Sequence, residues 1–253
     1  FHFMEKYSNK SDRQRMLINM LAEMGRICKK NNLKYYLAYG TALGAIRYKG
    51  FIPWDNDVDI IVSIDDYKRF CDIINDEILD DYILCSVDHD TDYDSLKARI
   101  SHKNYFHNFI HIDIFPIVGV PKSILGRKLF IKVCYIIYRS YFIKKVNVHV
   151  NYKNKKRKRI IVLILKFLLK PIPANLIKLI FKRLSIVYPI NESDIIYNIC
   201  GSYGYKELIS KEYLGEPVLS EFEGLSLPIP EKWDAYLTHL YGDYMTPKQN
   251  NYV

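Results

Sequence analysis

The stretch Tyr39–Asp59, YGTALGAIRYKGFIPWDNDVD, sets the order of secondary structure in the first half of the chain. A short β-prone run, Tyr35–Tyr39, leads into the pair Gly40-Thr41, and residues 42–47 are predicted to form a brief helix. Asp57–Val62 begins as an alternation of acidic and aliphatic residues, which predicts a strand with one polar and one buried face. Strand, glycine turn, helix and strand in this order indicate a mixed α/β domain.

The flanking segments extend this pattern over the first 118 residues. Apolar residues at steps of three and four predict helices over 11–30 and 65–79, and β-like runs occupy 82–87 and 111–118. The expected fold is α/β (α+β), with one mixed sheet flanked by helices. Further on we expect two or more helices between 122 and 190, broken at Pro171 and Pro173, then a turn-rich part and a helix over 231–240.

Charge is distributed very unevenly along the 253 residues. The chain has 37 Lys and Arg against 28 Asp and Glu, a net charge of +9, yet residues 114–191 contain 18 basic residues and no carboxylate. The rest of the chain is therefore acidic, at −9. We predict a catalytic core made of 1–121 and 192–253, and a basic helical insert at 122–191.

Five widely spaced cysteines, without a CxxC pair or a Cys/His cluster, argue against a disulfide framework or a zinc site and favour a reducing, cytoplasmic compartment. The longest aliphatic run, Ile160–Leu165, is too short for a membrane-spanning helix. We therefore expect a cytoplasmic protein, peripheral at the inner face of the cell membrane.

Acidic side chains supply the first candidate site. Asp57 and Asp59 point to the same side of the predicted strand, and such a pair is stable when a hard divalent cation, Mg²⁺ or Mn²⁺, lies between them. Asp113, between aliphatic residues in a second strand, would complete a cluster of three carboxylates. The alternatives are a solvated acidic turn at Asp57 and Asp59 and an edge-facing acid at Asp113.

A phosphate site is predicted beside these acids. Backbone N–H groups at Gly40-Thr41, between a strand and a helix, can bind phosphate, and Arg47, Lys97 and Arg99 can neutralise its charge. Thr41 is otherwise an ordinary helix cap, and the three cations are otherwise surface charges.

Taken together, these features resemble the nucleotidyltransferase superfamily, and Tyr39–Asp59 resembles the signature of the LicD family. The resemblance continues in Leu96–Arg99, Ile112–Pro116 and Tyr241–Met245. Two positions depart from the family pattern: Asn56 stands where Asp is frequent, and Lys248 follows Pro247 where a second Pro is usual.

The resemblance implies transfer of a substituted phosphate from a CDP-activated alcohol, usually phosphocholine from CDP-choline, to a hydroxyl of a cell-surface glycan or its lipid-linked precursor, with release of CMP. Glycerol phosphate and ribitol phosphate are alternative cargoes. We expect Asp57 and Asp59 to hold the metal, and Asp113 to complete the metal site or accept the hydroxyl proton. Rival interpretations are nucleotidyl transfer to a small acceptor, a DxD glycosyltransferase, and a non-catalytic membrane-binding protein.

Two recognition surfaces are also predicted. An aromatic cage for a choline head group would draw on Tyr39 and Trp54, with Tyr35 and Tyr36 nearby, although core or surface aromatics are the simpler interpretation. Residues 122–191 would contact an anionic membrane surface, because they combine Lys and Arg with aliphatic residues. Nucleic-acid binding is disfavoured because the other segments are acidic.

Overall fold

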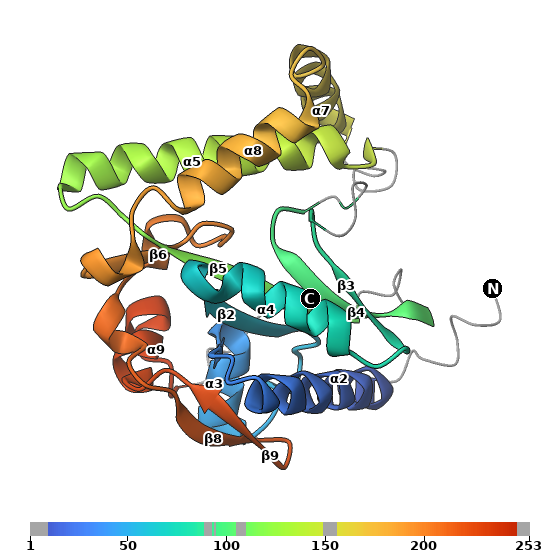
Figure 1. Ribbon diagram of the computed structural model, residues 1–253, viewed down its shortest axis with the longest axis vertical. Helices are drawn as coiled ribbons and strands as arrows, with labels where there is room; N and C mark the ends of the chain where they lie inside the picture. Colours follow the sequence, from blue (N-terminus) through green and yellow to red (C-terminus); the bar gives the residue numbers. More distant parts are fainter. Residues whose placement is uncertain (1–9, 89–92, 94, 105–109, 149–155, 247–253) are drawn as a thin grey trace.

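The computed structural model describes residues 10–88, 93, 95–104, 110–148 and 156–246, and shows a mixed sheet with helices packed around it (Figure 1). The predicted α+β fold is confirmed. The central path of the sheet runs β1-β2-β5-β4-β3, and β6 and β7 extend it. The strands of this path are β1 (Tyr36–Leu37), β2 (Val58–Ser63), β3 (Tyr82–Cys85), β4 (Ala98–His102) and β5 (His111–Gly119).

Strand β5 is the centre of the sheet and is buried along almost its whole length. It pairs in parallel with β2 and, along its other edge, in antiparallel fashion first with β4 and then with β6. Because β2 and β5 are parallel, the N-terminal ends of both strands lie at the same end of the sheet. The acidic residues lie at this end.

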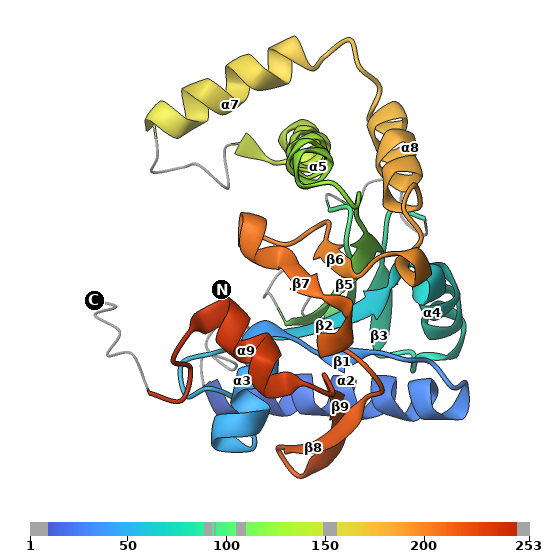
Figure 2. The ribbon, with the colours of Figure 1, turned by 90° about the vertical axis from the view of Figure 1, so that its left-hand side faces the viewer.

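Helices cover both sides of the sheet. Helix α2 (Lys10–Lys30) and helix α4 (Ile64–Glu77) pack together against β5, and α4 lies on the opposite side of the sheet from α9 (Trp233–Tyr241) (Figure 2). Helix α3 (Tyr39–Tyr48) packs between β2 and α9. The apolar stripe predicted for the first helix is completely buried, which explains its place on the core: Leu17, Met20, Leu21, Met24 and Ile27.

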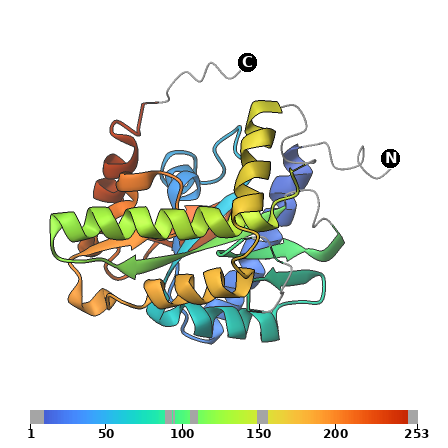
Figure 3. The same ribbon diagram turned by 90° about the horizontal axis from the view of Figure 1, so that it is seen from above.

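The basic segment forms three helices gathered at one end of the molecule (Figure 1), and seen from that end they lie in front of the sheet (Figure 3). These are α5 (Ile124–Lys145), α7 (Lys156–Leu168) and α8 (Ala174–Ser185), and Pro171 and Pro173 fall between the last two, as predicted. Strand β6 (Ile195–Asn198) returns to pair with the end of β5, so both ends of the segment meet at the sheet. Among the described helices, none is long and apolar enough to cross a bilayer.

Two local expectations were wrong. The strand before the glycine is only two residues long, because α3 already begins at Tyr39, so Gly40-Thr41 forms the first turn of a helix instead of a separate turn. The second concerns the C-terminal part, which contains strands that were expected to be turns. They are β6, β7 (Leu208–Ser210), β8 (Val218–Phe222) and β9 (Leu225–Ile229), accompanied by single 3₁₀ turns at Ile190–Glu192, Gly204–Glu207 and Lys211–Tyr213.

The turn of the β8–β9 hairpin explains why this hairpin was not predicted. Its two turn residues, Glu223 and Gly224, both have positive φ angles, of 50° and 78°, as the tight turn of a two-residue hairpin requires. Glutamate is an unusual residue in that position, where Asn or Asp is the recognisable signal.

Candidate active site

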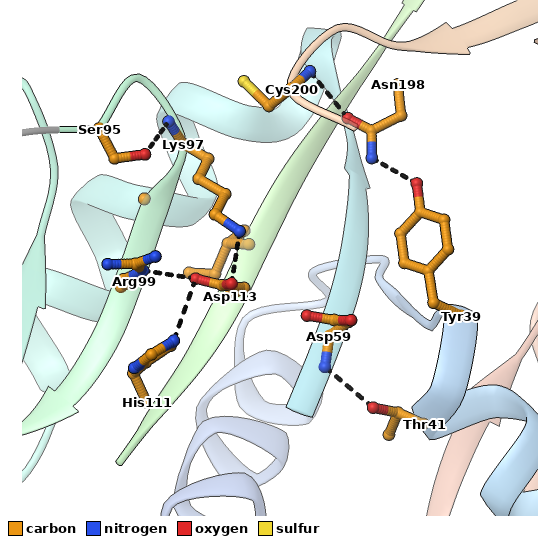
Figure 4. A network of polar contacts seen from close by, with 12 residues as sticks. Tyr39, Thr41, Asp59, Ser95, Lys97, Arg99, His111, Asp113, Asn198 and Cys200 are labelled. Carbon is orange, nitrogen blue, oxygen red and sulfur yellow. Dashed lines mark hydrogen bonds and ion pairs between the residues drawn. The ribbon is translucent and has the colours of Figure 1, made fainter. Parts of the chain in front are cut away.

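Three charged side chains stand in a row across the sheet. The register pairs Asp59 of β2 with Asp113 of β5, and Asp113 with Arg99 of β4 (Figure 4). Residues paired across neighbouring strands point to the same face, so the two carboxylates and the guanidinium share one surface. Asp57 lies just before β2, two residues from Asp59.

The first turn of α3 is tied to this row through backbone contacts. The backbone N–H of Asp59 donates to Thr41 Oγ1 at 2.9 Å, and the N–H of Ala38 donates to the carbonyl of Asp59 at 2.9 Å. Tyr39 begins the helix with a φ of 49°, a left-handed conformation that costs energy in a non-glycine residue. Its hydroxyl compensates by donating to Glu207 Oε2 at 2.5 Å and accepting a hydrogen bond from the amide of Asn198.

Asp113 is neutralised within the chain. Burial alone would raise the pKa of its carboxyl, but the positive charges of Lys97 and Arg99 outweigh burial, and the pKa is lowered. Arg99 Nε donates to Oδ1 at 2.6 Å, Lys97 donates to Oδ2, and His111 Nε2 lies 3.7 Å from Oδ1. Lys97 also lies 4.0 Å above the centre of the Phe115 ring. Asp113 is therefore an ionised, cation-paired carboxylate.

The carboxylates on the β2 side are compensated less, because the charge of Lys97 lowers the pKa of Asp59 by less than burial and the neighbouring acids raise it. Burial raises the pKa of Asp59 well above its usual value, and the negative charges of Asp57 and Asp113 add to the effect. Burial also raises the pKa of Asp55 to about 7, helped by a hydrogen bond shared with Asp57. Crowded, buried carboxyl groups with raised pKa values are characteristic of sites that bind a cation or move protons.

A cavity of about 590 Å³ opens over this row. Eight of the predicted site residues border it: Tyr39, Gly40, Arg47, Trp54, Asp57, Asp59, Lys97 and Asp113. The structure thus brings the predicted carboxylates, two of the predicted cations and both predicted head-group aromatics to one hollow.

Gly40 leaves room for the side chain of Asp55. A Cβ atom on this residue would lie 2.6 Å from Asp55 Oδ2, so the missing side chain lets the Asp55 carboxylate approach the first turn of α3. In that turn the N–H of Tyr39 donates to the hydroxyl of Tyr236 and the N–H of Ala42 to the carbonyl of Ala38, so the amides suited to bind an anion in the cavity are those of Gly40 and Thr41. Arg47, near the other end of α3, also borders the cavity, with its guanidinium 4.9 Å above the Tyr48 ring.

Other predicted residues lie outside the cavity wall. Thr41 is buried and accepts the N–H of Asp59, so its side chain supports the site from behind. Arg99 forms an ion pair with Asp113 but does not itself border the cavity. Tyr35 and Tyr36 are both buried away from the cavity wall, and the hydroxyl of Tyr36 donates to the carbonyl of Gly215. Lys248 lies outside the described residues.

The C-terminal part supplies a wall that the sequence alone did not assign. Tyr203 is 47% exposed and lies 5.7 Å from Tyr39 and 6.2 Å from Tyr241, measured between ring centres. The motif Tyr241–Met245 resembles the family, and three of its residues border the cavity: Tyr241, Asp243 and Tyr244. The sequence analysis assigned no chemistry to this motif. Tyr203 and Glu207 had no comparable signal. Asp55 shares the spacing of Asp57 and Asp59 and was detectable in the same way.

These residues fit a metal ion that is coordinated partly by the protein and partly by a bound substrate. Among the described residues, no three Asp, Glu, His or Cys side chains form a ready-made metal cluster, and both oxygens of Asp113 are already bonded to cations. Asp57 and Asp59 nevertheless offer two oxygen ligands beside a cavity that carries cations for phosphate. Mg²⁺ is commonly bound in this way, by one or two carboxylates with substrate phosphates and water completing the shell.

A mixed sheet with paired aspartates at the start of one strand, and a helix beginning beside them, agrees with the resemblance to the nucleotidyltransferase superfamily. Residues 32–154 match the model of the LicD/FKTN/FKRP nucleotidyltransferase domain. The resemblance to the LicD family is confirmed.

Three proteins of similar sequence were found, and one of them has a named activity. The chain is 27% identical to the lipopolysaccharide cholinephosphotransferase LicD of Haemophilus influenzae, over 92% of this chain and 90% of that protein. It is also 38% identical to an uncharacterized protein of Rickettsia typhi over 23% of this chain and 19% of the relative. A third match, an uncharacterized protein of Rickettsia prowazekii, is 36% identical over 24% of this chain and 23% of the relative. The prediction of a transferase enzyme agrees with the first of these names.

Proposed function

We propose that the chain transfers phosphocholine from CDP-choline to a hydroxyl of a cell-surface glycan or its lipid-linked precursor, and releases CMP. The observation that carries the proposal is the cavity that Asp57 and Asp59 border together with the cations Lys97 and Arg47. The name of the Haemophilus relative supports phosphocholine as the group transferred and lipopolysaccharide as the kind of acceptor.

The reaction is a substitution at phosphorus. The acceptor hydroxyl oxygen forms a bond to the phosphorus of phosphocholine, the bond from that phosphorus to the bridging oxygen breaks, and CMP leaves with that oxygen. The hydroxyl proton passes to a carboxylate of the site. Asp57 and Asp59 would hold Mg²⁺ or Mn²⁺, which neutralises the charge of the diphosphate when bound.

The chain's own cations and amides position the donor. Backbone N–H groups at Gly40 and the guanidinium of Arg47 border the cavity and are suited to bind phosphate oxygens. Asp113 has a lowered pKa and is therefore a weak base, so we assign it to holding Lys97 and Arg99 in place. Thr41 fixes the start of β2 by accepting the N–H of Asp59.

A choline head group would meet aromatic rings. Trp54 borders the cavity and is 49% exposed, and Tyr203 borders it and is 47% exposed. Tyr39 contributes mainly as support, because it is buried and its ring packs against Phe115 and Tyr203. A quaternary ammonium over an exposed ring gains about 0.5–2 kcal/mol.

We further propose that the chain works at the inner face of the cell membrane, where a lipid-linked acceptor would be found. The support is the basic segment 122–191, which contains no carboxylate and whose helix α7 packs outside the main core cluster. Nucleic acid is not a proposed partner.

The proposal is tested by incubating the purified chain with Mg²⁺, CDP-choline and a lipid-linked glycan acceptor, and measuring CMP by chromatography. We expect CMP to form in step with phosphocholine on the acceptor, and to depend on the metal. Binding of CDP-choline, CDP-glycerol and CDP-ribitol, compared by calorimetry, ranks the three donors. Release of pyrophosphate from a nucleoside triphosphate, or turnover of a nucleotide sugar, would replace the proposal with nucleotidyl transfer or glycosyl transfer.

A further inference from the structure

Helix α7 presents its apolar side to solvent. Six large apolar side chains of this helix are at least 44% exposed, and Phe167 reaches 74%. At 100° per residue they cover one continuous outer face: Ile160, Ile161, Leu163, Ile164, Phe167 and Leu168. Soluble monomers rarely expose a continuous apolar patch of this kind without a partner for it.

The opposite side of α7 is already satisfied by the rest of the chain. Val162 is the one residue of the helix that is buried, and it packs with Ile143 and Val146 of the α5 region. Lys166 points the same way and donates to the carbonyl of Val146 at 2.9 Å. The helix is thus attached along a narrow inner stripe, and the polar group of Lys166 is turned inward while the hydrophobic face is turned outward.

Positive charge lies at both ends of this face. Lys156, Arg157 and Lys158 are exposed in the first turn, and Lys170 is exposed just beyond the last. Cations in the first turn of a helix oppose its dipole, so this placement costs stability unless an external anion compensates. No carboxylate occurs anywhere in residues 114–191 to supply that compensation from within the segment.

We propose that the outer face of α7 inserts into the interface of an anionic lipid surface, with its apolar residues below the headgroups and the flanking Lys and Arg among them. This deepens the membrane contact proposed above and rests on it, but not on the identity of the donor. An apolar face bordered by cations is the pattern of helices that lie in the plane of a bilayer.

Charge and composition favour lipid over other partners. A second copy of this chain would bring two basic segments together without carboxylates to neutralise them. Single-stranded nucleic acid is commonly bound by stacking aromatics, whereas the outer face is aliphatic except for Phe167, and an aliphatic face has no counterpart on the phosphates of a duplex.

The position of α7 gives the contact a use. In Figure 2, the N-terminal end of α7 lies on the same side of the molecule as α3 and α9, whose residues border the cavity. When α7 rests on a lipid surface, the cavity therefore lies on the side of the molecule toward which the N-terminal end of α7 extends.

Vesicle sedimentation tests the inference without requiring turnover. The chain should sediment with vesicles that contain phosphatidylglycerol and much less with phosphatidylcholine alone. Phe167→Glu and Ile164→Glu should weaken sedimentation at least about tenfold, because each replaces an inserted apolar group by a charge. Leu219→Glu, at a site 70% exposed on β8, is the matched control and should change nothing.

A second measurement reports the depth of the helix directly. All five native cysteines are buried, so Phe167→Cys can be labelled selectively with an environment-sensitive dye, and Leu219→Cys provides the comparison. We expect a blue shift on adding anionic vesicles for the label at 167 alone.

Three outcomes would overturn the inference. The first is equal sedimentation of Phe167→Glu and the unaltered chain, and the second is a label at 167 that stays in water. The third is concentration-dependent dimerisation that Phe167→Glu abolishes, without vesicle binding. Release of CMP from donor and a soluble acceptor, measured in the same preparations, tests catalysis separately.

Discussion

Arg99 Nε lies 2.6 Å from Asp113 Oδ1, in a pairing that crosses from β4 to β5 and leaves the other carboxylate oxygen to Lys97. The lysine side chain is only 12% exposed and the aspartate 9%. The three groups therefore form a buried ion cluster between the sheet and the cavity. Removing one partner from such a cluster leaves an uncompensated charge in a poorly solvated place.

Asp113→Asn should accordingly destabilise the fold by about 3–5 kcal/mol, because Lys97 loses its counterion. Lys97→Met should cost less, since Arg99 remains bonded to the carboxylate. Urea unfolding of both variants and of the double variant measures the coupling. Glu216→Gln, which breaks the exposed pair with Lys34, is the control and should stay within about 1 kcal/mol. A cost for Asp113→Asn no larger than this control would contradict the buried cluster.

Asp59→Asn should separate metal binding from folding. Without metal, the variant should be as stable as the unaltered chain or more stable, because it removes a carboxylate that burial and neighbouring Asp57 disfavour in the charged form. With Mg²⁺ and CDP-choline the unaltered chain should gain thermal stability and the variant should not. Its turnover should fall more than about a hundredfold, because several kcal/mol of charge stabilisation are lost.

Asp80→Asn is the matched control for this prediction, since Asp80 is exposed and outside the cavity wall. It should leave both the thermal shift and the turnover unchanged. Substantial residual turnover in Asp59→Asn would remove Asp59 from the metal site.

Sequence alone predicted the acidic side of the site because the relevant residues lie within one local pattern. Two-residue spacing placed Asp57 and Asp59 together, and the glycine beside them marked the start of α3. Asp113 was predicted to join them from a second strand, but its bonds to Lys97 and Arg99 depend on the register of β4 against β5. Register across strands is set by the packing of the whole sheet, which no local pattern contains.

The C-terminal wall of the cavity could not be predicted from the sequence, for a similar reason. Tyr203 meets Tyr39 across 164 positions of sequence, and Glu207 reaches the Tyr39 hydroxyl across 168. Their place follows from β6 pairing with the end of β5, and β6 was itself missed. The backbone at Gly40-Thr41 was predicted to bind phosphate, which stays a prediction, but the contact of the Thr41 hydroxyl with the strand that carries Asp59 was not predicted, because it joins segments 18 positions apart.

Gly40→Ala tests how tightly the first turn of α3 is packed against the acids. The added methyl group would fall 2.6 Å from Asp55 Oδ2 and must displace that carboxylate. We expect turnover and donor affinity to fall at least about tenfold, since a catalytic group moved by an ångström loses much of its effect. Gly25→Ala in α2 is the control, because its nearest side-chain atom would be 3.3 Å away and the site is distant. Equal losses in the two variants would show a general effect on folding.

Tyr203→Ala and Trp54→Ala should discriminate between donors. Loss of a cation–π contact of about 0.5–2 kcal/mol should raise the KM for CDP-choline by roughly twofold to thirtyfold and leave that for CDP-glycerol nearly unchanged. Tyr203→Phe keeps the ring and should restore the preference. Tyr205→Ala is the control, because Tyr205 is 57% exposed but does not border the cavity. A parallel rise for both donors would mean that these rings shape the cavity without recognising the ammonium group.

Asp88 links the turn after β3 to α8, where Lys182 donates to its carboxylate and Lys178 Nζ lies 3.6 Å away. Burial would raise the pKa of Asp88, but the hydrogen bond and charge of Lys182 prevail and lower it. The folded state thus favours the ionised form, so the contribution to stability is present above about pH 4 and is lost as the pH falls through the folded-state value.

Asp88→Asn should therefore lower the free energy of unfolding at pH 7 by up to about 1 kcal/mol, because the pair is only partly buried. The difference from the unaltered chain should persist at pH 5 and shrink as the solution is acidified below about pH 4. Urea unfolding at each pH measures it, and Asp80→Asn serves again as the exposed comparison. A difference that grows on acidification would mean that Asp88 is protonated in the folded state, and would contradict the ion pair with Lys182.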